Sequence, residues 1–107
     1  MKNLLLLLLL VPVVSFGQTA VDLNTSGNTK LNFKDYKGAI EDYSKAIELD
    51  PDDADVYYNR GIAKDELKDY YGAIEDYSKA IELKPDYTNA YYNRGNAKKT
   101  LKDDYGA

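Results

Sequence analysis

The fold is decided by a twelve-residue stretch that occurs twice in the chain. It reads Gly38-Ala39-Ile40-Glu41-Asp42-Tyr43-Ser44-Lys45-Ala46-Ile47-Glu48-Leu49, and it recurs without a change at residues 72–83. A second block, Tyr57-Tyr58-Asn59-Arg60-Gly61, recurs at residues 91–95. Both offsets are 34 residues. Identical blocks that recur in one phase indicate a repeat protein, in which each unit buries its apolar face against the next.

Each repeat is predicted to contain two helices. In the quoted stretch, Ile40, Tyr43 and Ile47 recur at helical spacing and form an apolar side. The charged residues fall largely on the other side, so the paired carboxylates Glu41/Asp42 and Glu75/Asp76 are expected to face solvent. Ion pairs at i,i+4 spacing are expected at Glu41–Lys45 and Glu75–Lys79.

Capping residues and prolines mark where these helices begin and end. N-caps are predicted at Asp35 and Asp69, and the helices are expected to stop before Pro51 and Pro85. The following helices are expected to start at Asp52 and Asp86. Residues 20–32 form the least favoured helix, because asparagine and threonine are poor helix formers.

A 34-residue helix-turn-helix unit with this pattern resembles the tetratricopeptide (TPR) repeat. The matching positions are Tyr57, Gly61, Ala73, Tyr77, Ala80 and Pro85 in one unit, Leu23, Gly27, Ala39, Tyr43, Ala46 and Pro51 in the unit before it, and Tyr91, Gly95 and Ala107 in the unit after it. The resemblance implies an all-α fold in which antiparallel helix-turn-helix repeats stack as a short right-handed solenoid. The units are expected at residues 20–53, 54–87 and 88–107.

The resemblance also implies where the core lies. The three glycines should let the two helices of a unit approach closely, and Tyr43, Tyr57, Tyr77 and Tyr91 should lie in the core. Two positions depart from the family pattern. Polar residues stand just before each glycine, at Ser26, Arg60 and Arg94, and three places after it, at Lys30, Lys64 and Lys98. We expect these polar residues to weaken the packing of the first helix of each unit.

The last unit is expected to be incomplete. Gly106-Ala107 corresponds to the first turn of a second helix, so the apolar side of the preceding helix would be exposed. One interpretation is a fragment of a longer repeat array. The other is a short chain that covers this face by self-association. The DNA downstream of the Ala107 codon distinguishes them.

Residues 1–17 are predicted to be a secretory signal peptide. A basic start at Lys2 precedes an apolar run that is too short for a membrane helix, and Ser15-Phe16-Gly17 suits cleavage. The mature chain would begin at Gln18, with no membrane span, as a periplasmic or secreted bacterial protein. With no cysteine, the chain has neither disulfides nor a lipoprotein anchor. Its net charge of −4 argues against nucleic acid as a partner.

Little in the sequence points to catalysis. The chain has no histidine and no cysteine, so no catalytic, metal-binding or cofactor-binding residue is predicted, and it is not expected to be an enzyme. The acidic run from Asp50 to Asp55 has Asp55 where a calcium loop needs glycine and Gly61 where it needs glutamate. That run is therefore interpreted as a turn between repeats.

The resemblance implies a peptide-binding groove lined by the first helix of each unit. Carried onto this chain, the groove residues are Asn24, Asn28, Tyr58, Asn59, Ile62, Asp65, Tyr92, Asn93, Asn96 and Lys99. The alternative for Tyr58 and Tyr92 is that they only pack between neighbouring first helices. One branch of the family clamps a C-terminal carboxylate. Here Asn28 and Asn59 match its asparagines, but Asn24, Asn89 and Asn93 stand where it needs cations, so no such clamp is predicted.

The favoured function is a scaffold that binds a peptide or protein segment in this groove. Tyrosine offers rigid apolar area and amides can bond backbone groups, a composition suited to peptide contact. The alternative is a structural spacer within a larger exported or envelope protein whose activity lies beyond Ala107.

Overall fold

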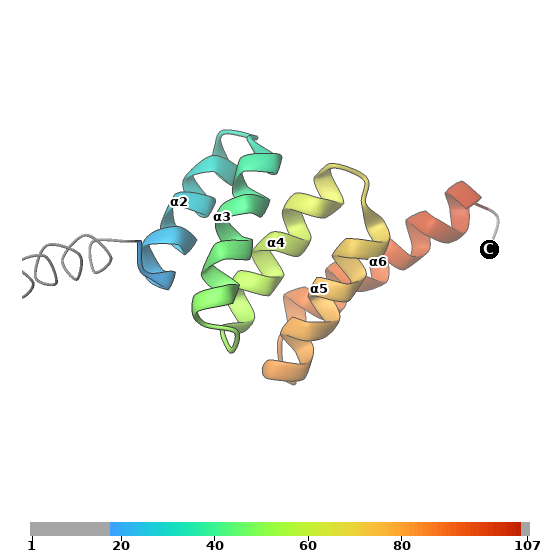
Figure 1. Cartoon of the computed structure of the whole chain (residues 1–107). Coiled ribbons are helices and arrows are strands. Elements are labelled where there is room, and N and C mark those ends of the chain that lie inside the picture. The colour runs from blue at the N-terminus through green and yellow to red at the C-terminus, as the bar shows by residue number, and fades with distance from the viewer. Residues whose placement is uncertain (1–17, 106–107) are drawn as a thin grey trace, which may run out of the picture.

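The computed structural model describes residues 18–105, and these residues form helices joined by short turns. The helices are α2 (Ala20–Asn32), α3 (Tyr36–Leu49), α4 (Ala54–Glu66), α5 (Tyr70–Leu83) and α6 (Thr88–Tyr105). They lie side by side in chain order, with α6 at one end (Figure 1). The predicted signal peptide and Gly106-Ala107 lie outside the described residues. The all-α prediction is confirmed for the described part of the chain.

A capping box explains why α2 forms despite its asparagines and threonines. The Thr19 hydroxyl accepts a hydrogen bond from the Asp22 backbone N–H at 3.1 Å, and the Asp22 carboxylate accepts one from the Thr19 backbone N–H at 3.2 Å. This reciprocal pair satisfies two donors that the first turn would otherwise leave without a partner. The remaining stabilisation comes from packing, because Leu23 and Gly27 of α2 are buried.

The predicted caps of the second helices are confirmed. Asp35 and Asp69 each accept a hydrogen bond from the backbone N–H three residues later, at 3.0 Å. Both helices end two residues before a proline, as expected. Their polar faces differ, however. Lys45 pairs with Glu41 at 3.4 Å as predicted, whereas Lys79 pairs with Glu82 at 3.4 Å and not with Glu75.

The predicted starts of the following first helices are wrong by one or two residues. The N-cap of α4 is Asp53, whose carboxylate accepts from the Asp55 backbone N–H at 3.0 Å. Asp52 lies in the turn, where its backbone N–H donates to the Asp50 carboxylate. Helix α6 begins at Thr88 and not at Asp86. The acidic run thus serves as a turn and a cap.

The core consists of two clusters that meet at α4. The first cluster joins α2, α3 and α4 through Leu23, Ala39, Tyr43, Ala46, Val56 and Ala63. The second joins α4, α5 and α6 through Tyr57, Ala73, Tyr77, Ala80 and Ala90. The predicted core positions of Tyr43, Tyr57 and Tyr77 are confirmed. That of Tyr91 is wrong, because 45% of this residue is exposed.

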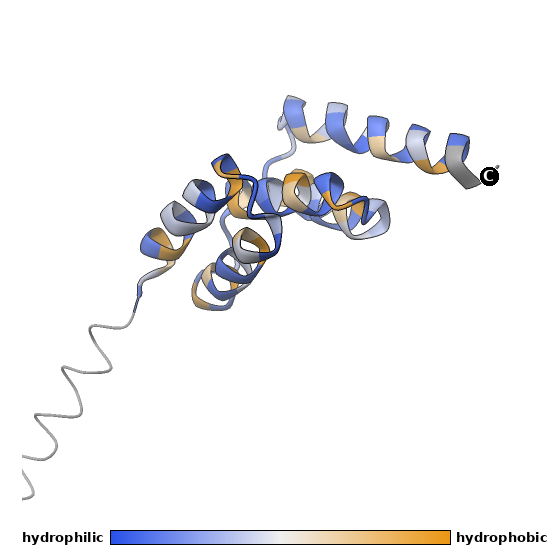
Figure 2. Cartoon of the chain, turned by 90° about the horizontal axis from the view of Figure 1, so that it is seen from above, coloured by the Kyte–Doolittle hydropathy of each residue, from blue (hydrophilic) through white to orange (hydrophobic). Residues whose placement is uncertain are grey.

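Close approach at the glycines is confirmed in two of the three units. A methyl group at Gly27 or Gly61 would lie 2.6 or 2.7 Å from a carbon of the Tyr43 or Tyr77 ring. At Gly95 such a group would meet nothing within 4 Å. Helix α6 is the last described helix and extends away from the other helices (Figure 2), and no second helix follows it within the described residues. None of the described helices combines the length and apolar character needed to cross a membrane.

Candidate functional site

The ten residues predicted to line a groove all lie on α2, α4 and α6, the first helices of the three units. We call this set the A-helix surface: Asn24, Asn28, Tyr58, Asn59, Ile62, Asp65, Tyr92, Asn93, Asn96 and Lys99. Helix α2 contacts α4 directly, although α3 stands between them in the chain. The fold therefore brings residues that are distant in sequence onto neighbouring first helices.

Hydrogen bonds between amides and a tyrosine link these helices across the A-helix surface. The Asn59 side-chain Nδ2 of α4 donates to Asn28 Oδ1 of α2 at 3.2 Å. The Asn93 Nδ2 of α6 donates to the Tyr58 hydroxyl of α4 at 2.8 Å. These hydrogen bonds join the first helices of neighbouring units. The same side chains therefore hold the first helices together and form part of the A-helix surface.

The hydroxyl groups of two buried tyrosines on the second helices bond to residues of the same surface. The Tyr43 hydroxyl donates to Asn28 Oδ1 at 2.6 Å, and the Tyr77 hydroxyl donates to Asp65 Oδ2 at 3.1 Å. Burial raises the pKa of Tyr43 to about 12 and raises that of Tyr77 as well. Burial also raises the pKa of Asp65 above its ordinary value. Sequence periodicity predicted these tyrosines as core, but it gave no sign that their hydroxyls reach the A-helix surface.

Tyr58 and Tyr92 occupy repeat-equivalent positions but have different environments. The Tyr58 ring packs against Tyr87 and Tyr77, with ring centroids 4.9 and 5.8 Å apart, and burial raises its pKa. Among the described residues, no aromatic ring packs on Tyr92, which is 69% exposed. Tyr58 therefore packs between helices, whereas the Tyr92 ring is exposed to solvent.

Tyr87 is a residue that sequence reasoning missed. It lies in the turn before α6, packs on Tyr58, and donates its hydroxyl to the Asp55 carboxylate at 2.6 Å. Burial raises its pKa, and the hydrogen bond to Asp55 adds to this effect. The repeat-equivalent residue in the preceding unit is Asp53, so the repeat pattern carried no signal for a tyrosine here.

The remaining members of the A-helix surface differ in burial and in hydrogen bonding. Asn96 and Lys99 are exposed, and their side chains have no hydrogen-bond partner among the described residues. Ile62 packs partly on the second core cluster. Asn24 Oδ1 is buried without a hydrogen-bond partner. The Oδ1 atoms of Asn59 and Asn93 likewise accept no hydrogen bond within the described chain, so α4 and α6 offer amide acceptors, and α6 also carries the exposed ring of Tyr92.

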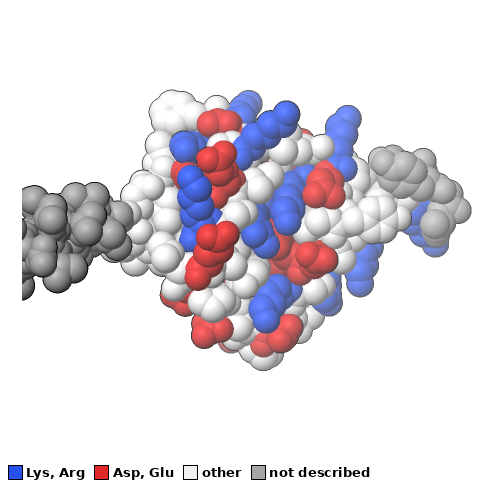
Figure 3. Space-filling view, in the orientation of Figure 1, with Lys and Arg blue, Asp and Glu red and all other residues white. Residues whose placement is uncertain are grey.

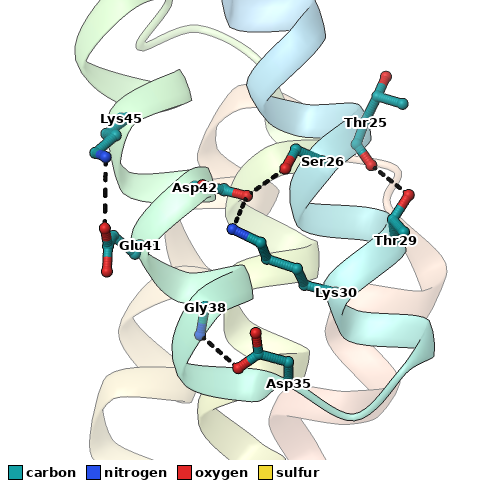
Figure 4. Close-up of polar contacts among 9 residues, drawn as sticks. All are labelled: Thr25, Ser26, Thr29, Lys30, Asp35, Gly38, Glu41, Asp42 and Lys45. Atoms are coloured by element: carbon teal, nitrogen blue, oxygen red, sulfur yellow. Dashed lines mark hydrogen bonds and ion pairs between the residues drawn. The ribbon is translucent and has the colours of Figure 1, made fainter.

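The prediction that Asp42 and Asp76 face solvent is wrong. Asp42 is buried, accepts a hydrogen bond from the Ser26 hydroxyl at 2.6 Å, and pairs with Lys30 at 2.9 Å (Figure 4). Burial opposes the charge on Asp42. The hydrogen bonds from Ser26 and Lys30 outweigh burial and hold the pKa of Asp42 below its usual value of 3.8.

Asp76 is the repeat-equivalent carboxylate, and it pairs with two cations where Asp42 pairs with one. It is only 1% exposed, and its two oxygens accept from Arg60 Nε and Nη2, both at 2.8 Å. The Lys64 ammonium adds a third contact at 3.1 Å. Arg60 also donates to Ser44 at 3.1 Å, which ties the group to the preceding unit. A buried carboxylate is tolerated here because it is paired with two cations.

These pairs also show what the polar residues around the glycines contact. Ser26, Arg60, Lys30 and Lys64 are the partners of the two buried carboxylates. Positive and negative side chains are interspersed over the face shown in Figure 3. Within the described residues, no group of three or more acidic, histidine or cysteine side chains is placed to hold a metal ion.

Comparison with known proteins agrees with this architecture. Residues 28–64 match the family described as TPR repeat, and residues 54–87 match the family described as tetratricopeptide repeat. Serine/threonine-protein phosphatase 5 of Homo sapiens is 48% identical over 44 residues, which are 41% of this chain and 9% of the phosphatase. The match thus spans a small part of that protein's length.

Two solved structures show the likeness in three dimensions. The second TPR of Spaghetti (RPAP3), bound to the HSP90 peptide SRMEEVD, is 31% identical with a TM-score of 0.77, and the alignment covers 80% of each chain. The TPR2B domain of yeast Sti1, in complex with an Hsp70 peptide, is 31% identical with a TM-score of 0.75 and covers 78% of this chain and 67% of that one. Sequence, fold and helix register therefore agree that this chain belongs to the tetratricopeptide repeat family.

Proposed function

We propose that this chain is a protein-interaction module that holds an extended segment of another protein against the A-helix surface. The observation that carries the proposal is that α4 and α6 present the free Oδ1 atoms of Asn59 and Asn93 and the free amide of Asn96, and that α6 also carries the exposed ring of Tyr92. Similar TPR structures were solved with bound peptides, which supports binding as the mode of action. The proposed role is binding and not catalysis.

The chemistry of the surface favours an uncharged segment. Lys30, Arg60 and Lys64 are committed to buried carboxylates, so they are not available to an acidic ligand. Within the A-helix surface, Lys99 is the one cation and Asp65 the one anion. The peptide SRMEEVD is acidic, and this chain has asparagines where a carboxylate clamp needs cations. Amides can instead bond the peptide backbone, with Tyr92 covering an apolar side chain.

A pair of exposed tyrosines provides a matched test. Tyr92 lies on the A-helix surface, whereas Tyr71 of α5 is 74% exposed but lies outside it. Peptides would be selected from a random display library on the purified protein, and their affinities measured by fluorescence anisotropy. We expect the double variant Tyr92→Ala, Asn96→Ala to lose about 1–3 kcal/mol of binding free energy, and Tyr71→Ala to bind as the wild type does.

A second comparison tests the charge preference. We expect the peptide SRMEEVD to bind no more tightly than SRMQQVN with an amidated C-terminus, in which amides replace all of its carboxylates. Equal binding by the Tyr92→Ala, Asn96→Ala variant, or selection of strongly acidic peptides only, would contradict the proposal. If no peptide were selected at all, the spacer interpretation would be favoured.

We further propose that the chain is exported and begins at Gln18 after cleavage. The basic start, the apolar run of residues 4–14 and the small residues at Ser15 and Gly17 support this. Mass spectrometry of the protein from a host with a secretory pathway would show Gln18 as the first residue. A mature protein that still begins at Met1 would refute export by this signal.

A further inference from the structure

The two edges of the solenoid carry different repeated dipeptides at their turns. The α2–α3 and α4–α5 turns lie at one edge, and the α3–α4 and α5–α6 turns lie at the opposite edge (Figure 1). The first edge carries Phe33-Lys34 and Leu67-Lys68, which are 34 residues apart and which we call the lysine turns. The second edge carries Pro51-Asp52 and Pro85-Asp86, also 34 residues apart, which we call the aspartate turns.

The side chains of these four turns are free to meet another molecule. Every residue of the four dipeptides is exposed, and Phe33 is 80% exposed although it is aromatic. Within residues 18–105, the side chains of Lys34, Lys68, Asp52 and Asp86 make no hydrogen bond and no ion pair. Each turn therefore presents an apolar residue that is followed by an unpaired charge.

The neighbouring charges of opposite sign already have partners. At the edge with the lysine turns, Asp35 and Asp69 cap helices, each accepting a backbone N–H at 3.0 Å, and Glu66 accepts a hydrogen bond from a tyrosine hydroxyl. At the opposite edge, the Lys84 ammonium lies over the Tyr87 ring, 4.8 Å from its centroid. The unpaired charges of the four turns are thus positive at one edge and negative at the other.

Backbone geometry points to a role for the two lysine side chains. Lys34 and Lys68 have φ values of 65° and 66°, in the left-handed region. Glycine adopts this conformation readily, whereas a residue with a side chain is strained there. Both turns nevertheless carry lysine, so the turn geometry does not explain the residue type.

We propose that the lysine turns of one copy of this chain dock on the aspartate turns of a second copy. Lys34 pairs with Asp52 of the second copy, and Lys68 pairs with its Asp86. The apolar residue before each lysine packs on the proline before each aspartate. Both contacts form together, because the two turns of each kind are separated by the same step of one repeat. A second copy therefore supplies the complementary charges at the matching spacing.

The proposed contact joins two different edges, so it is heterologous, and copies can add one after another in a row. The turns lie at the ends of the helices, so the A-helix surface of every copy stays open. Self-association of this kind is separate from peptide binding and goes beyond the proposed function. Two contacts between turns bury little surface, so we expect a weak association.

Charge reversal at each edge tests the proposal by sedimentation velocity, up to millimolar concentrations of the purified chain. We expect the average mass to grow with concentration at about 0.01 M salt and to return to that of a monomer at about 1 M salt, because the Debye length falls from about 30 Å to about 3 Å. The double variants Lys34→Glu, Lys68→Glu and Asp52→Lys, Asp86→Lys should each associate at least about tenfold more weakly. Their equimolar mixture should associate again, because it restores opposite charges at every contact.

Matched controls separate the turns from the net charge of the chain. Lys45→Glu, Lys79→Glu and Glu41→Lys, Glu75→Lys change the net charge by the same amounts, but they lie within α3 and α5. Both controls should associate as the wild type does, and circular dichroism would show that all variants keep their helices. The two variants reversed at the turns should still bind peptides at the A-helix surface, so a failure of either binding mode is seen by itself.

The lysine and aspartate turns are ruled out as a contact between copies by any of four results. A wild type that stays monomeric at low salt would refute a second copy as the occupant. Association that persists in either reversed variant would assign the contact to another surface, such as the uncovered side of α6. Equal loss in the matched controls would reduce the effect to net charge. A mixture of the reversed variants that stays monomeric would refute the pairing of lysine turns with aspartate turns.

Discussion

Gly61→Ala is a small change whose effect can be worked out from the contact between α4 and α5. The new methyl carbon would lie 2.7 Å from Tyr77 Cε1, 2.9 Å from Tyr77 Cδ1 and 3.3 Å from Asp76 Cβ. Real methyl contacts are close to 3.4–4 Å, so the ring has to move. Tyr77 is almost fully buried and its hydroxyl is bonded to Asp65, so the ring has nowhere to go without breaking that bond.

Two opposing effects set the magnitude. Overpacking a buried contact costs about 1–3 kcal/mol. Replacing glycine by alanine within a helix contributes about 0.5–1 kcal/mol in the other direction, because alanine loses less backbone entropy. We therefore expect Gly61→Ala to lower the free energy of unfolding, by up to about 2.5 kcal/mol once the helix gain is subtracted.

Gly95→Ala is the matched control, because it places the same substitution at the equivalent position of α6. A methyl group there meets nothing within 4 Å, so only the helix gain remains. We expect this variant to raise the free energy of unfolding by up to about 1 kcal/mol. Urea denaturation followed by far-UV circular dichroism, with all chains at one concentration, measures both effects.

The opposite signs are the critical result. If Gly61→Ala raised the free energy of unfolding, as Gly95→Ala is expected to do, the assignment of Gly61 to close helix contact would be refuted. A destabilised Gly95→Ala variant would mean that a second helix already covers α6 in solution. The concentration dependence of its denaturation midpoint would then identify self-association.

Three further predictions concern the buried charges and a strained turn. Asp76→Ala leaves Arg60 unpaired and should lower the free energy of unfolding by about 3–5 kcal/mol in the urea assay. Glu75→Ala, at the neighbouring exposed residue, should change it by no more than about 0.5 kcal/mol. Equal losses would contradict a buried ion pair. Because the pKa of Asp42 is depressed in the folded state, its stabilisation is present above pH 3.8 and is lost as the pH falls further. The urea midpoint of Asp42→Asn should thus depend less on pH below 4 than that of the wild type, and parallel curves would rule out this role. Lys68 has a positive φ of 66°, so Lys68→Gly should stabilise by about 1 kcal/mol, and a lower thermal midpoint would argue against strain there.

The parts of the fold that were predictable rest on local and repeated signals. Two identical blocks at one offset revealed the unit, and Asp35 and Asp69 marked helix starts, because an N-cap acts within three residues of sequence. The starts after the acidic turn were misplaced. Asp52 and Asp53 are both good caps by type, and the backbone path of the turn selects Asp53.

The helices that carry the A-helix surface residues were predictable, but the surroundings of these residues were not. The repeat phase placed all ten A-helix surface residues on first helices. It could not show that Tyr58 is enclosed while Tyr92 is open, because that difference comes from Tyr87 in a turn and from the absence of a helix beyond α6 within the described residues. Nor could it show that Asn59 reaches Asn28 across 31 positions of sequence.

The sequence by itself determined the repeat length, the pairing of helices and the apolar face of each second helix, since these follow from periodicity along one chain. Only the tertiary structure decided which polar residues are buried and which are exposed. Asp76 belongs to the charged side of its own helix, yet the approach of α4 at Gly61 encloses it and supplies Arg60 and Lys64. A charged side chain can be buried where a neighbouring helix covers it and supplies a partner of opposite charge. The sequence pattern of one helix carries no information about that neighbour.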